Sequence, residues 1–272
     1  MKKINFIILI IFVTIFSLQS TYAQVDYIQI NGENGSINWT TQLVTATGKV
    51  VIDTVSYPNK EQANMMAERG ATAIAQRNLL EIVKGIRVVS TTKGKKNNNS
   101  VEYLITENDK INTSVAGVLK NAKKVGKTKY ENGYASVTME SPLYQGNNSI
   151  ASAVFRKKSS QATKPPIRRE DIYFYVVAKN HKQVLFPKIY DNKGNLAVNF
   201  MDYYNKFLNF PTTKAINDAD LEKLKNTKYT IIIELKEDKR GNFHSSDSNV
   251  DWAKINSELR ANKKMQILIR KN

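Results

Sequence analysis

Apolar residues between Asn59 and Gly85 recur at the spacing of an α-helix. The apolar stripe consists of Ala67, Ala71, Ile74, Ala75, Leu79, Ile82 and Val83. Asn59 is suited to cap the start of this helix, with Gln62 completing a reciprocal capping pair, and Gly85 is suited to end it. The small alanines near its start indicate that the helix begins close to a sheet.

The segments around this helix are rich in β-branched residues and predict strands. Gln42–Thr54 reads as extended chain in which Gly48 fits a turn or bulge. Two hairpins are predicted, one from 86–92 and 101–106 around the loop 93–100, the other from 125–130 and 134–140 around Asn132–Gly133. Between them a second helix is expected, in which Gly117 allows close approach to a neighbour. Its apolar face consists of Ile111, Val115, Val118, Leu119 and Ala122.

The second half of the chain is also predicted to contain both strands and helices. Strands are predicted at 172–177, 184–190, 229–235 and 265–269. One helix is expected from Asn217 or Asp218, and another begins after Ser248 and Asp251, which have capping-box spacing. The sequence thus predicts an α+β protein: an antiparallel sheet covered by two helices on one face, followed by a second, smaller α+β domain.

The N-terminus has the order of features found in secretory signal peptides. Lys2 and Lys3 precede an apolar run from Phe6 to Phe16. We expect cleavage between Ala23 and Gln24; the alternative is an uncleaved anchor helix. The mature chain has no further apolar stretch of spanning length, so we expect it to be soluble or peripherally attached rather than integral. From the signal peptide we expect an exported protein, periplasmic or associated with the outer membrane or cell surface. The expected domains are 1–23 (signal peptide), 24–155, 156–169 (linker) and 170–272.

Composition limits the chemistry that the chain can perform. It contains no cysteine and two histidines, His181 and His244, which we interpret as surface residues without metal-ligand spacing. The phosphate-loop, dinucleotide, nucleophile-elbow and zinc-helix motifs are missing, so we expect no catalytic residue, cofactor or metal. An enzyme acting on glycans, built from two carboxylates distant in sequence, remains an alternative.

The formal net charge is +17, and its densest part is the segment 156–169. This segment and the loop 93–100 could contact anionic lipid or lipopolysaccharide; the alternative is a solvated linker. The residues concerned are Lys93, Lys95, Lys96, Arg156, Lys157, Lys158, Lys164, Arg168 and Arg169. An exported protein is not expected to bind nucleic acid.

Four aromatic residues gather within a short, otherwise polar stretch. They are Tyr203, Tyr204, Phe207 and Phe210. They could form an exposed patch that binds a partner. Their spacing equally fits a short helix that packs on the second sheet.

The segment Ala75 to Val88 reads AQRNLLEIVKGIRV and resembles the signature of the Lpp-twenty lipoprotein family, a domain similar to the N-terminal domain of flagellar assembly protein T. The resemblance covers about residues 36–150, and 186–194 is similar to the C-terminal portion of longer members. Other residues in the expected order are Asn38, Trp39, Ile111, Val115, Gly117, Val118, Ala122, Val125, Gly133, Val137, Met139, Pro142, Leu143 and Gly146. The resemblance implies an envelope or surface protein without catalytic residues. The chain lacks the acylated cysteine of the lipoprotein members.

These observations lead to one expected function and one binding alternative. We expect an exported, non-catalytic structural or accessory protein that docks to a protein assembly of the cell envelope. The alternative is a module that binds anionic envelope polymers or lipid head groups through its basic segments.

Overall fold

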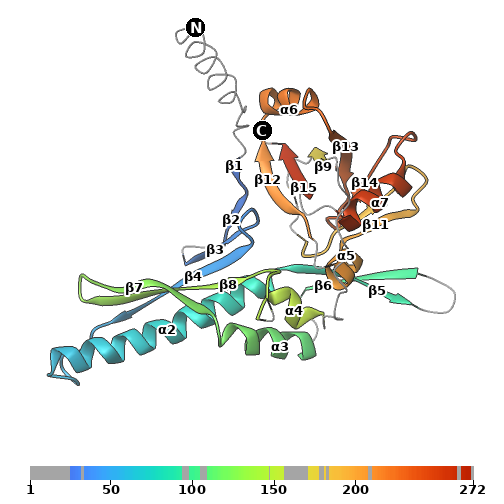
Figure 1. Ribbon diagram of the computed structural model, residues 1–272. Coiled ribbons are helices and arrows are strands. Elements are labelled where there is room, and N and C mark those ends of the chain that lie inside the picture. Colours follow the sequence, from blue (N-terminus) through green and yellow to red (C-terminus); the bar gives the residue numbers. More distant parts are fainter. Residues whose placement is uncertain are drawn as a thin grey trace, which may run out of the picture.

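The structure is a computed structural model that describes residues 25–31, 34–93, 98–104, 109–146, 148–155, 171–177, 181, 184–207, 210–261 and 265–270. It has an α+β fold, as predicted, with two larger sheets and their helices (Figure 1). The predicted cleavage site at Ala23 and Gln24 lies outside the described residues, as does the linker 156–169.

The first sheet has five strands, all antiparallel, in the order β2-β3-β4-β8-β7. Their bounds are β2 (Ile28–Ile30), β3 (Gly35–Asn38), β4 (Leu43–Val51), β7 (Lys123–Glu131) and β8 (Tyr134–Pro142). Asn132 (φ 53°) and Gly133 (φ 75°) join β7 to β8. Positive φ at both central residues is the geometry of a primed turn, so the predicted hairpin is confirmed.

Helix α2 (Lys60–Lys84) packs on β4 and β8. The side chain of Asn59 accepts a hydrogen bond from the backbone of Gln62 (3.0 Å), and Gly85 follows the last turn, as predicted. The fully buried residues of the helix are Ala63, Ala67, Ala71, Ala75, Leu79 and Val83. Ile74, predicted on this face, is instead 38% exposed, because the buried row follows a strict four-residue spacing that leaves position 74 outside it.

The expectation of a turn or bulge at Gly48 is wrong. Gly48 lies within β4 and pairs with Val137 on β8 in an unbroken register. A Cβ atom at this position would lie 2.0 Å from the carbonyl oxygen of Ala71 and 2.4 Å from the backbone nitrogen of Ala75. Gly48 therefore lets the backbone of α2 approach the sheet at its alanine face.

The second helix, α3 (Asp109–Leu119), has its main contacts with α2 and with α4 (Ile150–Val154). Its predicted residues Val115 and Leu119 are buried. The close approach expected at Gly117 is wrong, because this residue is exposed and no atom lies within 4 Å of a Cβ built on it. Strands β5 (Arg87–Lys93) and β6 (Asn98–Leu104) pair antiparallel, which confirms the other hairpin.

The second sheet is mixed and has eight strands in the order β1-β12-β15-β9-β13-β14-β10-β11. Their bounds are β1 (Val25–Asp26), β9 (Asp171–Val177), β10 (Lys188–Tyr190), β11 (Leu196–Asn199), β12 (Thr212–Ile216), β13 (Thr230–Glu237), β14 (Phe243–His244) and β15 (Met265–Arg270). Strands β12, β15, β9 and β13 are parallel neighbours. The chain returns between parallel strands through α6 (Asp218–Lys225) and α7 (Trp252–Ala261).

Two local predictions in this half need correction. The strand expected at 184–190 is limited to Lys188–Tyr190, because Val184 forms only an isolated bridge to Arg87 of the first half. Helix α7 begins at Trp252, so Asp251 rather than Ser248 caps it: the Asp251 carboxylate accepts from the backbone of Lys254 (3.0 Å).

One buried hydrophobic cluster includes residues from both halves of the chain. Strand β1, at the start of the first half, completes the edge of the second sheet by pairing with β12. Across the same junction, the Thr40 hydroxyl donates to the carbonyl of Thr213 (2.6 Å) and the Gln42 amide donates to that of Pro211 (3.3 Å). The halves therefore share a core.

Candidate functional site

The predicted basic residues cannot be placed as a surface. Lys95, Lys96 and the six basic residues of 156–169 lie outside the described residues. Lys93 ends β5, but its side chain is not described. Contact with anionic lipid or lipopolysaccharide therefore stays a prediction.

The predicted aromatic patch is wrong for the rings that the structure describes. Tyr203 and Tyr204 lie on α5 (Phe200–Phe207), where they are 6% and 0% exposed. Phe210 is partly buried and stacks on Tyr144, with ring centroids 4.8 Å apart. Tyr204 and Phe210 lie at the junction between the halves, next to Tyr144, whereas Tyr203 hydrogen-bonds to Asn256 on α7 of the second half. The side chain of Phe207 lies outside the described part of the chain.

The first sheet has one face that no described helix covers. Residues directly opposite each other in antiparallel strands point to the same side, and alternate residues point to opposite sides. Val44, Ala46, Val137 and Met139 face α2 and are buried. On the other side lies a surface that we call the open face. On β3, β4 and β8 it consists of Ser36, Thr45, Thr47, Lys49, Val51, Tyr134, Ser136, Thr138 and Glu140. On β7 the residues paired with these are Lys123, Val125, Lys129 and Glu131.

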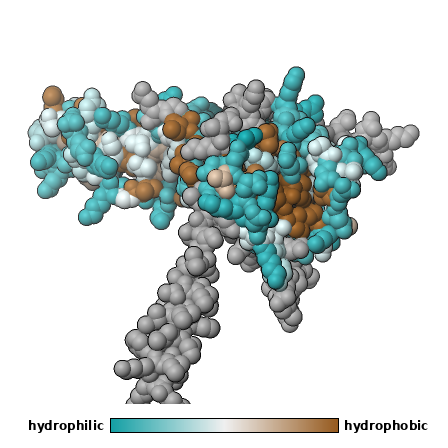
Figure 2. Space-filling view, turned by 90° about the horizontal axis from the view of Figure 1, so that it is seen from above, coloured by the Kyte–Doolittle hydropathy of each residue, from teal (hydrophilic) through white to brown (hydrophobic). Residues whose placement is uncertain are grey.

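Hydroxyl groups form the centre of the open face. The hydroxyl oxygens of Thr47 and Thr138 lie 3.0 Å apart across β4 and β8, and those of Ser36 and Thr45 lie 3.1 Å apart across β3 and β4. Lys49 lies over the ring of Tyr134, 4.2 Å from its centroid. Seen from above in Figure 2, the arm formed by the first half carries scattered rather than continuous hydrophobic residues. The face is thus rich in hydroxyl groups, with isolated apolar residues between them.

The edge of the same sheet is protected against pairing with another strand. Edge strand β7 carries the exposed Lys123, Lys127 and Lys129. Charged lysines on an edge disfavour addition of a further strand. A partner is therefore expected to meet the open face of the sheet rather than its β7 edge.

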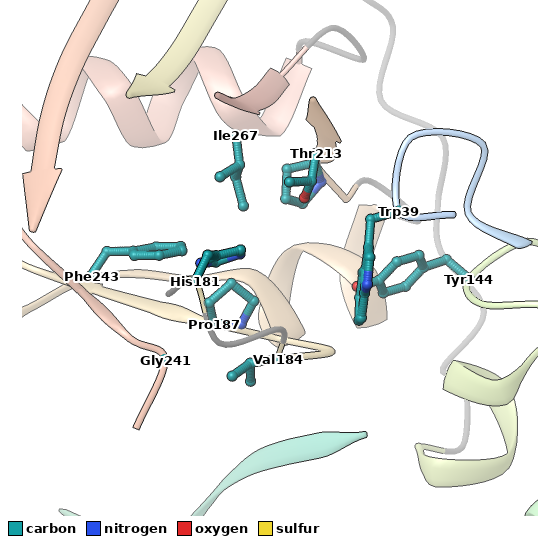
Figure 3. Close-up of a pocket in the computed structure, with 10 residues that line it drawn as sticks. Trp39, Tyr144, His181, Val184, Pro187, Thr213, Gly241, Phe243 and Ile267 are labelled. Carbon is teal, nitrogen blue, oxygen red and sulfur yellow. The ribbon is translucent and has the colours of Figure 1, made fainter. Parts of the chain in front are cut away.

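A small pocket at the junction of the halves is lined in part by His181 (Figure 3), whose ring also contacts the side chain of Glu237. His181 Nδ1 lies 3.1 Å from Glu237 Oε2, and both side chains are 6% exposed. The His181 ring stacks on Phe243 and meets the edge of Tyr27. Its predicted surface position is therefore wrong, since aromatic rings from both halves enclose it; the side chain of His244, in contrast, is 42% exposed.

The volume of this pocket shows what it can hold. It measures about 10 Å³, room for one water molecule. Trp39 and Tyr144 of the first half face Pro187 and Ile267 of the second across it (Figure 3). We interpret it as a tightly packed junction rather than a ligand site.

Two further observations concern metals and membranes. Among the residues that the structure describes, no group of three His, Asp or Glu side chains could hold a metal ion. Within the same residues, no helix combines the length and the apolar character needed to cross a bilayer.

Comparison with protein-family models found no match for this chain, and comparison with curated proteins found none. The resemblance to the Lpp-twenty family therefore stays a prediction.

The open face was missed by the sequence analysis, although a signal for it was present. Residues 44–50 alternate between Val, Ala or Gly and Thr or Lys. This two-residue period indicates a strand with one buried and one open side.

Proposed function

We propose that the protein is an exported, non-catalytic component of a bacterial cell envelope that docks to another envelope protein through the open face. The observation that carries the proposal is the five-stranded sheet with one face packed on α2 and the other available to solvent. The signal-like N-terminus and the resemblance to the Lpp-twenty family support the location.

The chemistry of the open face favours a protein partner. Its threonine and serine hydroxyls both donate and accept hydrogen bonds, while Val51 (58% exposed) and Tyr134 (37% exposed) add apolar area. Helix α2 holds the strands from behind, so little conformational entropy is lost on docking. The charged residues of the open face are of both signs: Lys49 and Glu140 on β4 and β8, and Lys123, Lys129 and Glu131 on β7.

Photo-crosslinking in intact cells tests the docking surface. A crosslinking amino acid at position 47 or 138 samples the open face, and the same residue at the exposed positions 73 or 77 samples the outer side of α2. We expect the two open-face positions to yield an adduct of the same mass, absent from the α2 controls. Equal adducts at all four positions, or none from the open face, would contradict the proposal.

The location has its own test, independent of docking. We expect cell fractionation and intact-mass measurement to find a chain that begins at Gln24 outside the cytoplasm, and a bulky residue in place of Ala23 to block this processing. A chain that still begins at Met1 in the cytosol would refute export.

The second candidate is binding to anionic envelope polymers, favoured by six basic and no acidic residues within 156–169. Such binding must weaken as salt rises, because the Debye length shortens. Retention on anionic vesicles at low salt that persists unchanged at high salt would reject this candidate.

A further inference from the structure

A second cavity lies at the surface of the other half, between β11, α5 and α7. Its volume is about 260 Å³, below the usual range for drug-sized ligands. The residues that line it are Leu196, Ala197, Asn199, Asp202, Tyr203, Asn256 and Arg260. Most of these side chains are polar, which favours a small and polar ligand.

Hydrogen bonds fix one wall of this cavity. The Asn256 amide nitrogen donates to the carbonyls of Ala197 (3.0 Å) and Trp252 (2.8 Å). Its amide oxygen accepts from the hydroxyl of Tyr203. Because both ends of the amide are engaged, the wall is already ordered before any ligand arrives.

Two opposite charges lie at this wall without neutralising each other. The exposed Asp202 and Arg260 line the same cavity, yet neither forms an ion pair with any residue that the structure describes. Asp202 accepts from the side chain of Asn199 (3.1 Å), and the side chain of Arg260 hydrogen-bonds to the phenol of Tyr203.

Asp202 and Arg260 both influence the pKa of the Tyr203 phenol. Burial raises the pKa of Tyr203; Arg260 opposes this rise and Asp202 adds to it. Buried Lys188 is also within electrostatic reach of Asp202, which offsets part of the lowering of the Lys188 pKa by burial. Because Asp202 and Arg260 line the same cavity, the carboxylate and the guanidinium can both contact one small molecule bound there.

We propose that this cavity binds a small zwitterion, with its ammonium group at Asp202 and its oxyanion at Arg260. A ligand with one charge would meet one attractive and one repulsive group, whereas a zwitterion satisfies both. The oxyanion belongs to a carboxylate in a free amino acid or to a phosphate in a phosphoethanolamine head group. Arginine binds either of these through paired N–H donors.

Titration of the purified full chain tests the site, with the side-chain amide NMR signal of Asn256 as readout. The probes are alanine and glycerophosphoethanolamine as zwitterions, and propionate and propylamine as singly charged counterparts. We expect saturable shifts with at least one zwitterion and binding at least tenfold weaker for both singly charged probes. Preference for one zwitterion identifies the source of the ligand.

Charge-removing variants assign the binding to the two residues. Asp202→Asn and Arg260→Gln should each weaken binding of the preferred zwitterion at least tenfold. The matched controls Glu222→Gln and Lys225→Gln, an exposed pair on α6, should change it less than twofold. No saturable shift with either zwitterion, or unchanged binding in both cavity variants, would overturn the proposal.

Discussion

Gly48 and Gly117 are expected to have opposite effects on stability, because their surroundings differ. Gly48 faces the backbone of α2, with Ala71 and Ala75 in the space that a side chain would need. Gly117 lies on an exposed helical position with open space around it. At Gly48 the missing Cβ is a packing requirement, whereas at Gly117 it only increases the entropy lost on folding.

The variants Gly48→Ala and Gly117→Ala should therefore change stability in opposite directions. Gly48→Ala forces α2 away from β4, and we expect a loss of about 1–3 kcal/mol in the free energy of unfolding. Gly117→Ala should gain up to about 1 kcal/mol. Urea unfolding measures both, and equal effects of the two substitutions would contradict the packing role of Gly48.

The sequence predicted correctly two features that depend only on neighbouring residues. The cap at Asn59 and the turn at Asn132–Gly133 depend on neighbours within a few residues, and both predictions are confirmed. A glycine is needed at position 48 because α2, which begins more than ten residues later, packs against it. The strand pattern alone does not show this contact and suggested a turn or bulge instead.

At the scale of elements, edge strand β7 is attached to α2 by polar contacts. Glu68 on α2 pairs with Lys124 on β7 and accepts from the hydroxyl of Tyr130 (2.9 Å). The hydrogen bond from Lys124, followed by that from Tyr130, lowers the pKa of Glu68 from its usual 4.5.

This lowered pKa predicts a specific pH dependence. The folded chain binds the Glu68 proton less readily than the unfolded chain, so the contribution to stability is complete above pH 4.5 and is lost as pH falls through the lowered pKa. Glu68→Gln should reduce the free energy of unfolding at neutral pH. The reduction should be small, because the Glu68–Lys124 pair is partly exposed to solvent. The same substitution should flatten the acid limb of the curve of stability against pH. Urea midpoints measured from neutral to acidic pH check this, with Glu61→Gln as an exposed control on the same helix; an unchanged acid limb in Glu68→Gln would refute it.

The arrangement of elements was less predictable than their existence. Strands β9, β13 and β15 are apolar runs and were predicted. Strand β12 is polar and short, and β1 precedes the first sheet in sequence but pairs with β12 in the second. The periodicity of apolar residues does not predict which strands pair, because pairing depends on contacts between residues distant in sequence.

At the scale of the whole molecule, aromatic residues hold the halves together. Tyr144 of the first half donates to the carbonyl of Leu185 (2.5 Å), and Tyr204 donates to the carbonyl of Tyr144 (3.2 Å). Phe186 packs against both tyrosine rings. The aromatic stretch around Tyr204 was noticed in the sequence. Its partner in the first half, Tyr144, could not be identified there, because more than fifty residues separate the two.

The open face was likewise visible only once the pairing of β4 with β8 was known.

A shared core predicts that the two halves unfold together. Tyr144→Phe removes one buried hydroxyl and leaves the carbonyl of Leu185 without this donor, at an expected cost of about 1–3 kcal/mol. Trp39 lies at the junction of the halves and Trp252 lies on α7 of the second half, so single-tryptophan variants report on these two places by fluorescence. We expect both probes to show the same midpoint in the parent chain and the same decrease in Tyr144→Phe. Tyr134→Phe makes the same chemical change at a partly exposed position and should have little effect. Separate midpoints for the two tryptophans, or a decrease confined to one of them, would show that the junction does not couple the halves.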